Sequence, residues 1–251
     1  MDLGLKGKVA IVTGGSKGIG SGCAQVLAEE GCHVAVVYRS DVEGSEAFVQ
    51  SLRDLGTESI GVCADITQEG MPDYVFDTVI EKLGPVDILI NNANGGQPRG
   101  KSFDTVSLEE WRRGFEGTLH HAFAMSNRFV RECRQNKRGG HIVNVLAKAA
   151  IMTNSRNNTT YIAAKGALTT MTRGLANEVI DDGIYVNGIV PGYVQTRVYP
   201  PGAPNTVYKE QFLRVGWAQP RDMGTVAAFL CSPVACQVVG AIVDCSGGTM
   251  L

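Results

Sequence analysis

A tyrosine and a lysine, Tyr161 and Lys165, stand four residues apart in a segment that predicts a helix over 159–182. Residues with this spacing fall on the same face of an α-helix. The phenol of an isolated tyrosine has a pKa of about 10, and a nearby ammonium lowers that value because it stabilises the phenolate. We therefore expect Tyr161 to exchange a proton as a general acid or base, with Lys165 as its electrostatic support.

A glycine-rich turn follows the first apolar run of the chain. Gly14, Gly18 and Gly20 are spaced for a tight strand-to-helix turn in which the backbone can approach a pyrophosphate. The helix that begins there would offer unpaired N–H groups to the phosphates. The position after the first strand, with Thr13 before the turn and Ile19 inside it, favours a dinucleotide site over a turn that serves packing alone.

The end of the second apolar run indicates which dinucleotide binds. An acidic residue there would accept hydrogen bonds from the adenosine ribose and repel a 2′-phosphate, but the run ends in Arg39 and Ser40. Arg39 can form a charge-assisted fork with a 2′-phosphate, Ser40 can donate to it, and Lys17 can add a second positive charge. This combination predicts NADP(H), and the nearby Asp41 leaves some use of NAD open.

Short apolar runs alternate with longer amphipathic segments and would position these residues. Seven runs predict strands, over 9–12, 33–38, 59–64, 86–90, 141–146, 184–190 and 241–243. Helices are predicted over 18–30, 42–55, 68–83, 107–135, 159–182 and 221–231. The alternation predicts an α/β fold, a single doubly wound Rossmann-type domain over 1–251 with a seven-stranded parallel sheet flanked by helices. Ligands of such sheets bind beyond the carboxyl ends of the strands.

Composition narrows the class of protein. Hydrophobic residues make up 44% and charged residues 19% of 251 residues, which suits a soluble globular chain. A net charge of −2 and a pI near 6.1 give no electrostatic basis for binding nucleic acid or an anionic membrane, so a small-molecule partner is expected. Seven cysteines without Cys-x-x-Cys spacing indicate reduced thiols of a cytoplasmic protein, and no metal site is expected. The absence of a signal core and of a long apolar run disfavours export and membrane spanning.

The glycine-rich turn and the Tyr161/Lys165 pair together resemble the short-chain dehydrogenase/reductase family, and 3-oxoacyl carrier-protein reductases in particular, over nearly the whole chain. The resemblance implies a tyrosine that exchanges a proton with the substrate oxygen while hydride passes to or from nicotinamide, and a lysine that also holds the nicotinamide ribose. It implies catalytic roles for Tyr161, Lys165 and Thr118. It implies cofactor contacts from Gly14, Ser16, Lys17, Gly18, Ile19, Gly20, Arg39, Ser40, Asp65, Ile66, Asn92, Ala93, Tyr161, Lys165, Pro191, Gly192, Val194 and Thr196.

Three positions depart from the family pattern. Asn94 replaces the glycine of an Asn-Asn-Ala-Gly motif, and the turn can survive because asparagine tolerates positive φ. Ala147 replaces a serine that steadies the substrate oxygen. Thr118 replaces an asparagine that holds a water in the proton relay, and threonine is shorter and lacks the amide. Loss of one oxyanion-type donor commonly lowers a rate on the order of a hundred- to a thousandfold.

The segment between Ala147 and Tyr161 is the first place to look for a replacement donor, although a polar surface loop is the interpretation we favour. Its polar residues are Thr153, Asn154, Ser155, Asn157, Asn158, Thr159 and Thr160. Lys148 could turn toward the site, but a lysine at a strand end is more often solvated. His120 and His121 are expected to pack or to lie in an interface rather than to act in catalysis.

Three functions remain open. The favoured one is an NADP(H)-dependent carbonyl reductase or alcohol dehydrogenase with Tyr161 as the general acid. The second is reduction of a conjugated C=C bond, because family branches with that activity tolerate loss of the serine. The third is a cofactor-binding protein with little turnover, against which the retention of both Tyr161 and Lys165 argues.

A substrate lid is expected over 198–217. Its prolines and aromatic residues are Tyr199, Pro200, Pro201, Pro204, Tyr208, Phe212 and Trp217. They suit an apolar or ring-containing substrate, or equally pack the lid against the body. The resemblance further implies a homotetramer or homodimer formed through the helices near 107–135 and 159–182 and the C-terminal strand.

Overall fold

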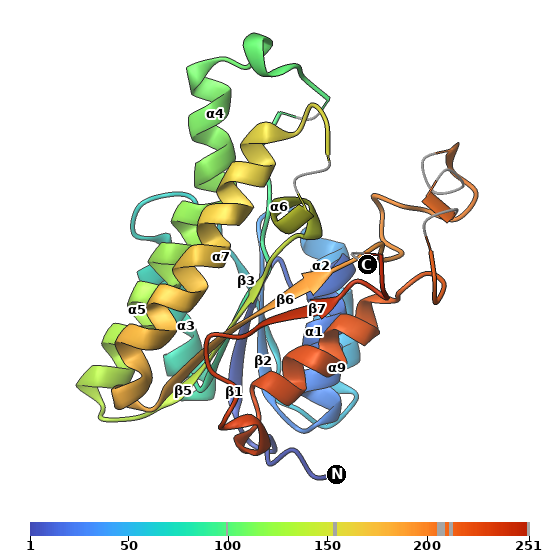
Figure 1. Ribbon diagram of the computed structural model, residues 1–251. Helices are drawn as coiled ribbons and strands as arrows, with labels where there is room; N and C mark the ends of the chain where they lie inside the picture. The colour runs from blue at the N-terminus through green and yellow to red at the C-terminus, as the bar shows by residue number, and fades with distance from the viewer. Residues whose placement is uncertain (99, 153–154, 205–208, 211–212, 250–251) are drawn as a thin grey trace.

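The computed structural model describes residues 1–98, 100–152, 155–204, 209–210 and 213–249, and they form a three-layer α/β domain (Figure 1). Its strands are β1 (Val9–Thr13), β2 (His33–Tyr38), β3 (Ile60–Cys63), β4 (Ile88–Asn91), β5 (Gly140–Val145), β6 (Ile184–Pro191) and β7 (Ile242–Cys245). All neighbouring pairs are parallel, in the order β3-β2-β1-β4-β5-β6-β7. The predicted doubly wound sheet of seven parallel strands is confirmed.

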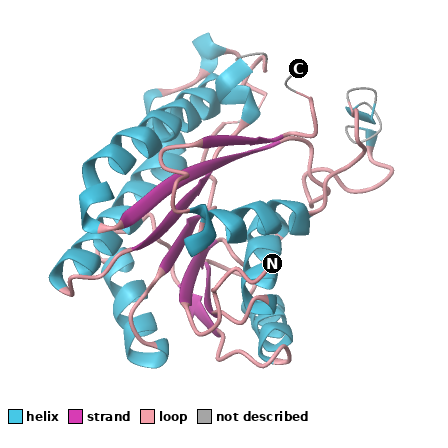
Figure 2. Ribbon diagram, turned by 60° about the horizontal axis from the view of Figure 1, so that its bottom comes forward, coloured by secondary structure: helices cyan, strands magenta, loops and turns pink. Residues whose placement is uncertain are grey.

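Helices cover both faces of the sheet (Figure 2). They are α1 (Gly18–Glu29), α2 (Val42–Arg53), α3 (Met71–Leu83), α4 (Leu108–Phe115), α5 (His121–Gln135), α6 (Lys148–Met152), α7 (Thr159–Val179) and α9 (Pro220–Leu230). One face packs on α1, α2 and α9, and the other on α3, α5 and α7. In the described part of the chain, no helix has the length and apolar character needed to cross a membrane.

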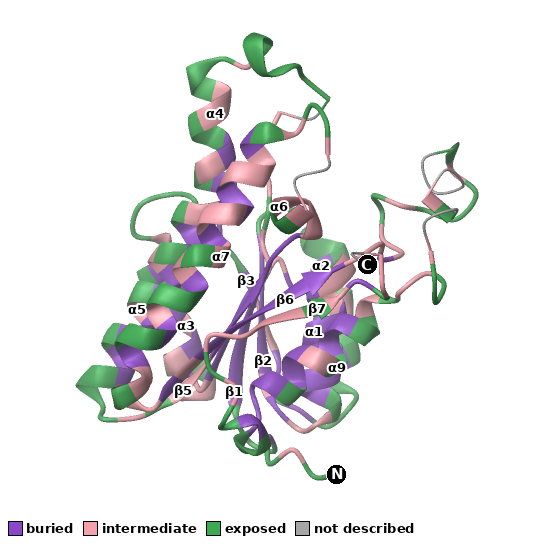
Figure 3. Ribbon diagram, in the orientation of Figure 1, coloured by how far each residue is buried: buried purple, intermediate pink, exposed green. Residues whose placement is uncertain are grey.

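The apolar runs become strands because both faces of the sheet are covered. Along β1, Ala10 and Val12 belong to one hydrophobic core, whereas Val9 and Ile11 belong to the other. Side chains alternate between the two faces of a strand, so every position of a doubly covered strand must be apolar. The central strands, such as β1 and β4, are accordingly buried, whereas the edge strands β3 and β7 are only partly buried and the outer surfaces of the helices are exposed (Figure 3).

The structure differs from the predicted helices at two places. The predicted helix over 107–135 is interrupted by a π-helical turn, Glu116–His120, between α4 and α5. The segment after Ala147 is not wholly a loop, because Lys148–Met152 forms α6. The favourable helix propensity of Lys148, Ala149 and Ala150 accounts for this short helix.

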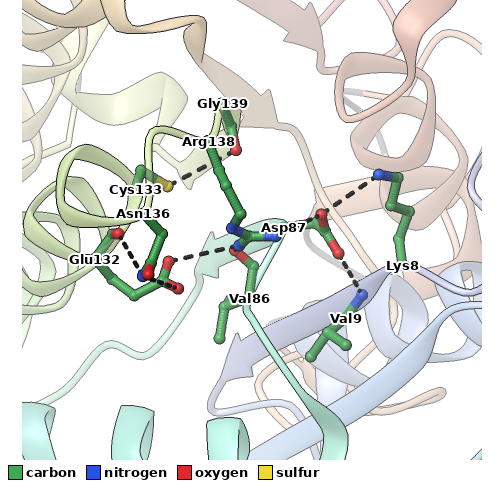
Figure 4. Close-up of polar contacts among 9 residues, drawn as sticks. All are labelled: Lys8, Val9, Val86, Asp87, Glu132, Cys133, Asn136, Arg138 and Gly139. Carbon is green, nitrogen blue, oxygen red and sulfur yellow. Dashed lines mark hydrogen bonds and ion pairs between the residues drawn. The ribbon is translucent and has the colours of Figure 1, made fainter.

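A cluster of charged side chains links neighbouring strands at the amino ends of the sheet (Figure 4). Asp87 accepts from the backbone N–H of Val9 at 3.0 Å and pairs with Lys8 at 3.4 Å and with Arg138 at 3.5 Å. Arg138 also donates to the Val86 carbonyl at 2.8 Å. These contacts join the starts of β1, β4 and β5, so the ends with the candidate functional residues lie at the opposite edge of the sheet.

Candidate active site

The loops after β1 and β4 are joined by Thr13 and Asn92. The Thr13 hydroxyl donates to the Ile90 carbonyl at 3.2 Å and accepts from the N–H groups of Asn92 and Ala93 at 3.0 and 3.1 Å. The Asn92 side chain donates in return to the carbonyls of Thr13 and Gly14 at 3.0 and 3.1 Å. Strand order reverses between β1 and β4, the place at which doubly wound sheets bind nucleotides.

The glycine-rich turn is closed too tightly for a side chain at Gly20. A Cβ there would overlap the Gly14 carbonyl and the Asn92 amide, so only glycine fits. Lys17 is the N-cap of α1 and makes no side-chain cap, which leaves the first-turn N–H groups for another acceptor such as a phosphate. Gly18 lies beside Thr196, because a Cβ at Gly18 would be 3.4 Å from Thr196 Cγ2.

Lys17 and Arg39, the two cations predicted to bind a 2′-phosphate, each lie close to a carboxylate. Lys17 pairs with Asp41, and this ion pair lowers the pKa of Asp41, as does the hydrogen bond from the Gly44 N–H. Arg39 Nη1 lies 4.0 Å from Asp65 Oδ2, and its side chain is 72% exposed. Lys17 and Arg39 lie at the carboxyl edge of the sheet, as their positions after the first two strands predict. The ion pair between Lys17 and Asp41 joins two separate loops and was not predicted.

The other predicted cofactor residues lie at the same carboxyl edge of the sheet. Asp65 follows β3 and accepts from the Thr67 hydroxyl at 2.7 Å, and the next residue, Ile66, is buried. Pro191 ends β6, and Gly192 packs closely against the backbone of Ser246. The remaining members, Ser16, Ile19, Ser40 and Ala93, lie in or next to the loops after β1, β2 and β4.

Lys165 is a buried ammonium fixed at the end of β5. Its side chain is 2% exposed, and Nζ donates to the Val145 carbonyl at 2.6 Å. Burial lowers the pKa of Lys165 to about 8. Tyr161 lies half-buried one turn earlier on the same face of α7. A protonated lysine has three donors, so the Lys165 ammonium can serve other acceptors besides Val145.

Thr118 lies in the π-helical turn and contacts the loop after β4. Its buried hydroxyl donates to Asn94 Oδ1 at 2.9 Å. One residue away on each side, the Gly95 N–H donates to the Gly117 carbonyl at 2.8 Å. A Cβ on Gly117 would overlap the Gly95 carbonyl, so glycine is required for this close approach. π-helical turns within α-helices are frequent at functional sites.

No replacement for the family serine is assigned within the described residues. Ala147 is buried two residues after the end of β5, and Thr160 is buried at the start of α7. Asn157 adopts positive φ and Asn158 is the N-cap of α7 without a side-chain cap. Thr153 and Asn154 fall outside the described residues.

The two neighbouring histidines differ in environment. His121 is 3% exposed, and its burial lowers its pKa to about 4, with the Lys165 charge acting in the same direction. His120 is exposed and its ring lies 6.4 Å from that of Phe115. Within the described ranges, no group of histidine, cysteine and carboxylate side chains has the arrangement of a metal site.

A short parallel bridge closes the base of the expected lid. Val194 pairs with Ala218, whose carbonyl accepts from the Gln195 N–H at 2.8 Å and whose N–H donates to the Tyr193 carbonyl at 3.2 Å. The described residues between them, 195–204, 209–210 and 213–217, project from the carboxyl edge of the sheet (orange in Figure 1). Tyr208 and Phe212 lie outside the described residues.

Three aromatic rings gather at this base. Tyr193, Tyr199 and Trp217 have ring centroids between 5.7 and 6.1 Å apart. Tyr199 and Trp217 belong to the lid predicted over 198–217, whereas Tyr193 lies outside it and was not predicted. The available indication was its place directly after Pro191-Gly192.

Comparison with known proteins identifies the family. The short chain dehydrogenase family model matches residues 8–203. The chain is 35% identical over 254 residues to 7alpha-hydroxysteroid dehydrogenase of Escherichia coli K12, covering 98% of this chain and 96% of that protein.

Solved structures agree with this assignment. A short chain dehydrogenase from Burkholderia cenocepacia in complex with NADP superposes with a TM-score of 0.91 at 29% identity, covering 98% and 99% of the two chains. A 7α-hydroxysteroid dehydrogenase complexed with NADH and 7-oxo glycochenodeoxycholic acid superposes with a TM-score of 0.90 at 34% identity, covering 98% and 96%. The chain belongs to the short-chain dehydrogenase family and is an oxidoreductase.

Proposed function

We propose that this protein is an NADP(H)-dependent oxidoreductase that transfers hydride between nicotinamide and a carbonyl or alcohol substrate, with Tyr161 as the general acid or base. The observation that carries the proposal is the buried Lys165 ammonium, fixed to the Val145 carbonyl one helical turn from Tyr161. A buried cation beside a phenol favours the phenolate and so suits the phenol for proton transfer.

The described residues fit a dinucleotide. Gly20 leaves no room for a Cβ, and the first turn of α1 has N–H groups without a side-chain cap, as a pyrophosphate site requires. Arg39 and Lys17 favour NADP(H) because they place positive charge in the loops after β2 and β1. Of the two solved relatives above, one holds NADP and the other NADH, so the proposed preference depends on these two side chains. When bound, the nicotinamide supplies or accepts the hydride.

The remaining chemistry falls to side chains of this chain. In the reducing direction, the Tyr161 phenol donates its proton to the substrate oxygen and is left as a phenolate. The Lys165 ammonium stabilises that phenolate and offers its other N–H groups to the nicotinamide ribose. Thr118, through Asn94, would hold the neighbouring part of the proton path. In the oxidising direction, the phenolate accepts the proton from the alcohol.

A second candidate is reduction of a conjugated C=C bond. The observation in its favour is the buried, apolar Ala147 at the end of β5, where a substrate oxygen would receive no hydroxyl donor. Hydride addition to carbon needs the oxygen only to be polarised, so fewer donors suffice.

The proposal also includes the lid over 198–217, a cytoplasmic location and assembly as a homotetramer or homodimer. The outer face of α5 and α7 supports assembly. A groove of about 300 Å³ there has an apolar part formed by Phe123, Val130, Met171 and Leu175, with Arg131, Arg134 and Glu178 also in its lining, and Phe123 is 58% exposed. Exposed apolar side chains with a charged rim on paired helices are typical of contacts between subunits.

NADPH oxidation by wild-type protein, Tyr161→Phe and Lys165→Met tests the proposal on a panel of ketones. Tyr161→Phe should lose nearly all ketone reduction while NADPH affinity, followed by fluorescence titration, stays within about threefold. Lys165→Met should lose both ketone reduction and NADPH affinity. Full ketone reduction by Tyr161→Phe would show that the acid is a different group.

A further inference from the structure

Asn144 places a polar side chain inside the core, on the face of β5 that α5 and α7 cover. It is fully buried, and it alternates along the strand with Ile142, which belongs to the hydrophobic core of that face. A buried amide is costly unless its oxygen and its nitrogen both have hydrogen-bond partners. The partners of Asn144 therefore show what this amide holds in place.

The Asn144 side chain joins the neighbouring strand β4 to the helix α7. Its Oδ1 atom accepts from Asn91 Nδ2 at 2.9 Å, and its Nδ2 atom donates to the Thr172 hydroxyl oxygen at 2.9 Å. The Thr172 hydroxyl in turn donates to the Leu168 carbonyl at 2.8 Å, which fixes the hydroxyl within the helix. Asn91 and Thr172 are buried as well, so water does not compete for these hydrogen bonds.

Both ends of the Asn144–Thr172 hydrogen bond lie next to the attachment of Lys165. Thr172 follows Lys165 by seven residues, about two helical turns, and so lies on the same face of α7. Asn144 directly precedes Val145, whose carbonyl accepts from Lys165 Nζ at 2.6 Å. The end of β5 is thus linked to one face of α7 twice, once through the Lys165 ammonium and once through the neutral amide.

The Val145 carbonyl is open to the ammonium because β4 ends too early to pair with it. Successive residues of a strand direct their backbone groups to opposite neighbours, and the Leu146 N–H donates to Ile189 of β6 at 2.8 Å. The Val145 carbonyl therefore faces the side of β4, where the pair of Asn91 and Asn144 is the last. The place of this carbonyl is then set by the anchored residue before it.

We propose that Asn144 and Thr172 are positioning residues for Lys165, whose hydrogen bond holds the end of β5 at the separation from α7 at which the ammonium supports Tyr161. A lysine has a flexible four-carbon stem, so the place of its ammonium follows the carbonyl that accepts from it. Both residues are fully buried and act only through Lys165. The inference rests on the proposed function and adds two residues to the support of the same site.

Three substitutions of a single hydroxyl test the inference. Thr172→Val removes the hydroxyl and keeps the β-branched shape, and Thr172→Ser keeps the hydroxyl. The matched control is Ser126→Ala on α5, which removes the buried hydroxyl that accepts from Asn91 at 3.0 Å on the other side of the same network. Urea unfolding verifies that each variant is folded, and Thr172→Ala, with its higher helix propensity, replaces Thr172→Val if the latter does not fold.

The pH dependence of alcohol oxidation is the first measurement. With NADP⁺, the probe is the secondary alcohol that wild type oxidises fastest among 2-butanol, cyclohexanol and 1-phenylethanol. The Tyr161 phenolate accepts the proton, so kcat rises with pH through the pKa of that phenol. A displaced ammonium stabilises the phenolate less, which raises this pKa.

The midpoint of the kcat profile should therefore move upward by about one pH unit in Thr172→Val, and kcat below the midpoint should fall about tenfold. KM for the alcohol should change less than threefold. Thr172→Ser and Ser126→Ala should keep the wild-type midpoint. An unmoved midpoint in Thr172→Val, or an equal movement in Ser126→Ala, overturns the inference.

Direct titration of the phenol separates failure of this inference from failure of the proposed function. The ultraviolet absorbance of tyrosinate is followed with pH in each protein and in the same protein with Tyr161→Phe, and the difference isolates the Tyr161 phenol. An upward movement in Thr172→Val but not in Ser126→Ala, without turnover of any alcohol, upholds the positioning role and contradicts the oxidoreductase function. Absence of that movement overturns the positioning role, whether or not an alcohol is oxidised.

Discussion

The Thr118 hydroxyl donates to the Asn94 side-chain oxygen at 2.9 Å, so two residues for which the sequence resemblance implies a departure from the family pattern are in direct contact. The resemblance implies that Thr118, in the π-helical turn, stands in place of an amide, and Asn94 brings an amide to the loop that packs on this turn. The same loop is fixed by the hydrogen bond from the Gly95 N–H to the Gly117 carbonyl. We interpret the pair as a compensated exchange in which the amide has moved from the helix to the loop.

The exchange predicts strong coupling between positions 94 and 118. Asn94→Gly should lower kcat severalfold, up to about tenfold, since this part-buried hydrogen bond is worth ~0.5–1.5 kcal/mol. Thr118→Asn alone should also lower kcat, because the larger amide crowds Asn94. The double variant Asn94→Gly, Thr118→Asn should return to within about threefold of wild type. Additive losses in this double-mutant cycle would mean that the two residues act independently.

Arg39 should decide between the two cofactors. Arg39→Asp should weaken NADPH binding more than tenfold and leave NADH binding little changed, because a charge-assisted fork to a 2′-phosphate is worth ~1.5–3 kcal/mol. Fluorescence titration with each cofactor measures both affinities. Unchanged NADPH affinity would show that Arg39 is only a solvated surface charge.

Asp41 should act in the opposite direction. It pairs with Lys17 and thereby competes with a 2′-phosphate for that ammonium. Asp41→Asn keeps an oxygen that can accept from the Gly44 N–H at the start of α2 and removes the charge. NADPH should bind severalfold more tightly to this variant while NADH changes less, and the opposite ranking would contradict the electrostatic argument.

Ala147 tests whether the missing donor limits the rate. Ala147→Ser should raise ketone reduction severalfold or more if the substrate oxygen lacks a partner, since one oxyanion-type donor is worth on the order of a hundredfold in established sites. The initial rate with saturating NADPH is the measurement, and Ala147→Cys is the size-matched control with a much weaker donor. An unchanged rate would indicate that another group, or the substrate itself, already fills this role.

Buried histidines should make the fold sensitive to acid. Burial lowers the pKa of His121 and of His141 from 6.5 to about 4. Between these two pH values the unfolded chain therefore binds protons at both histidines, whereas the folded chain does not. The contribution of these histidines to the free energy of unfolding should therefore be complete above pH 6.5 and should decrease as the pH falls toward 4. The expected decrease is ~2 kcal/mol per histidine between pH 7 and pH 5.

Urea denaturation at pH 7 and pH 5 measures this effect. His121→Leu should show a smaller decrease between the two pH values than wild type. The matched control, His120→Gln at the exposed neighbouring residue that ends the π-helical turn, should keep the wild-type decrease. A decrease of wild-type size in His121→Leu would exclude a contribution from that residue.

Sequence patterns predicted the sheet because its strands are apolar on both faces and bounded by turn residues. The predicted and observed bounds of β2, His33–Tyr38, coincide. The π-helical turn was not predicted because the amphipathic pattern continues through 116–120. The helix α6 was not predicted because its five residues are too few to show a periodic pattern. The type of a helix or strand can thus be predicted from the local sequence pattern, whereas a π-helical turn or a very short helix cannot.

The contacts that define the site depend on tertiary structure. Motif spacing placed Tyr161, Lys165 and the glycine-rich turn at the carboxyl edge, where the structure also has them. The Lys17–Asp41 pair and the Thr118–Asn94 hydrogen bond join segments that only the folded chain brings together. The position of Lys148 above Tyr193 likewise follows from the neighbouring strands β5 and β6, and it differs from the solvated lysine expected from the sequence.

The most direct test is NADPH consumption by the purified protein on paired substrates that offer either an isolated C=O or a conjugated C=C bond, with NADH measured alongside. Carbonyl reduction with NADPH, exceeding both the NADH rate and the rate on the C=C partner, is the predicted result. Turnover of the C=C partner alone would support the second candidate function. NADPH binding without turnover of either substrate would contradict the proposed catalytic role of Tyr161.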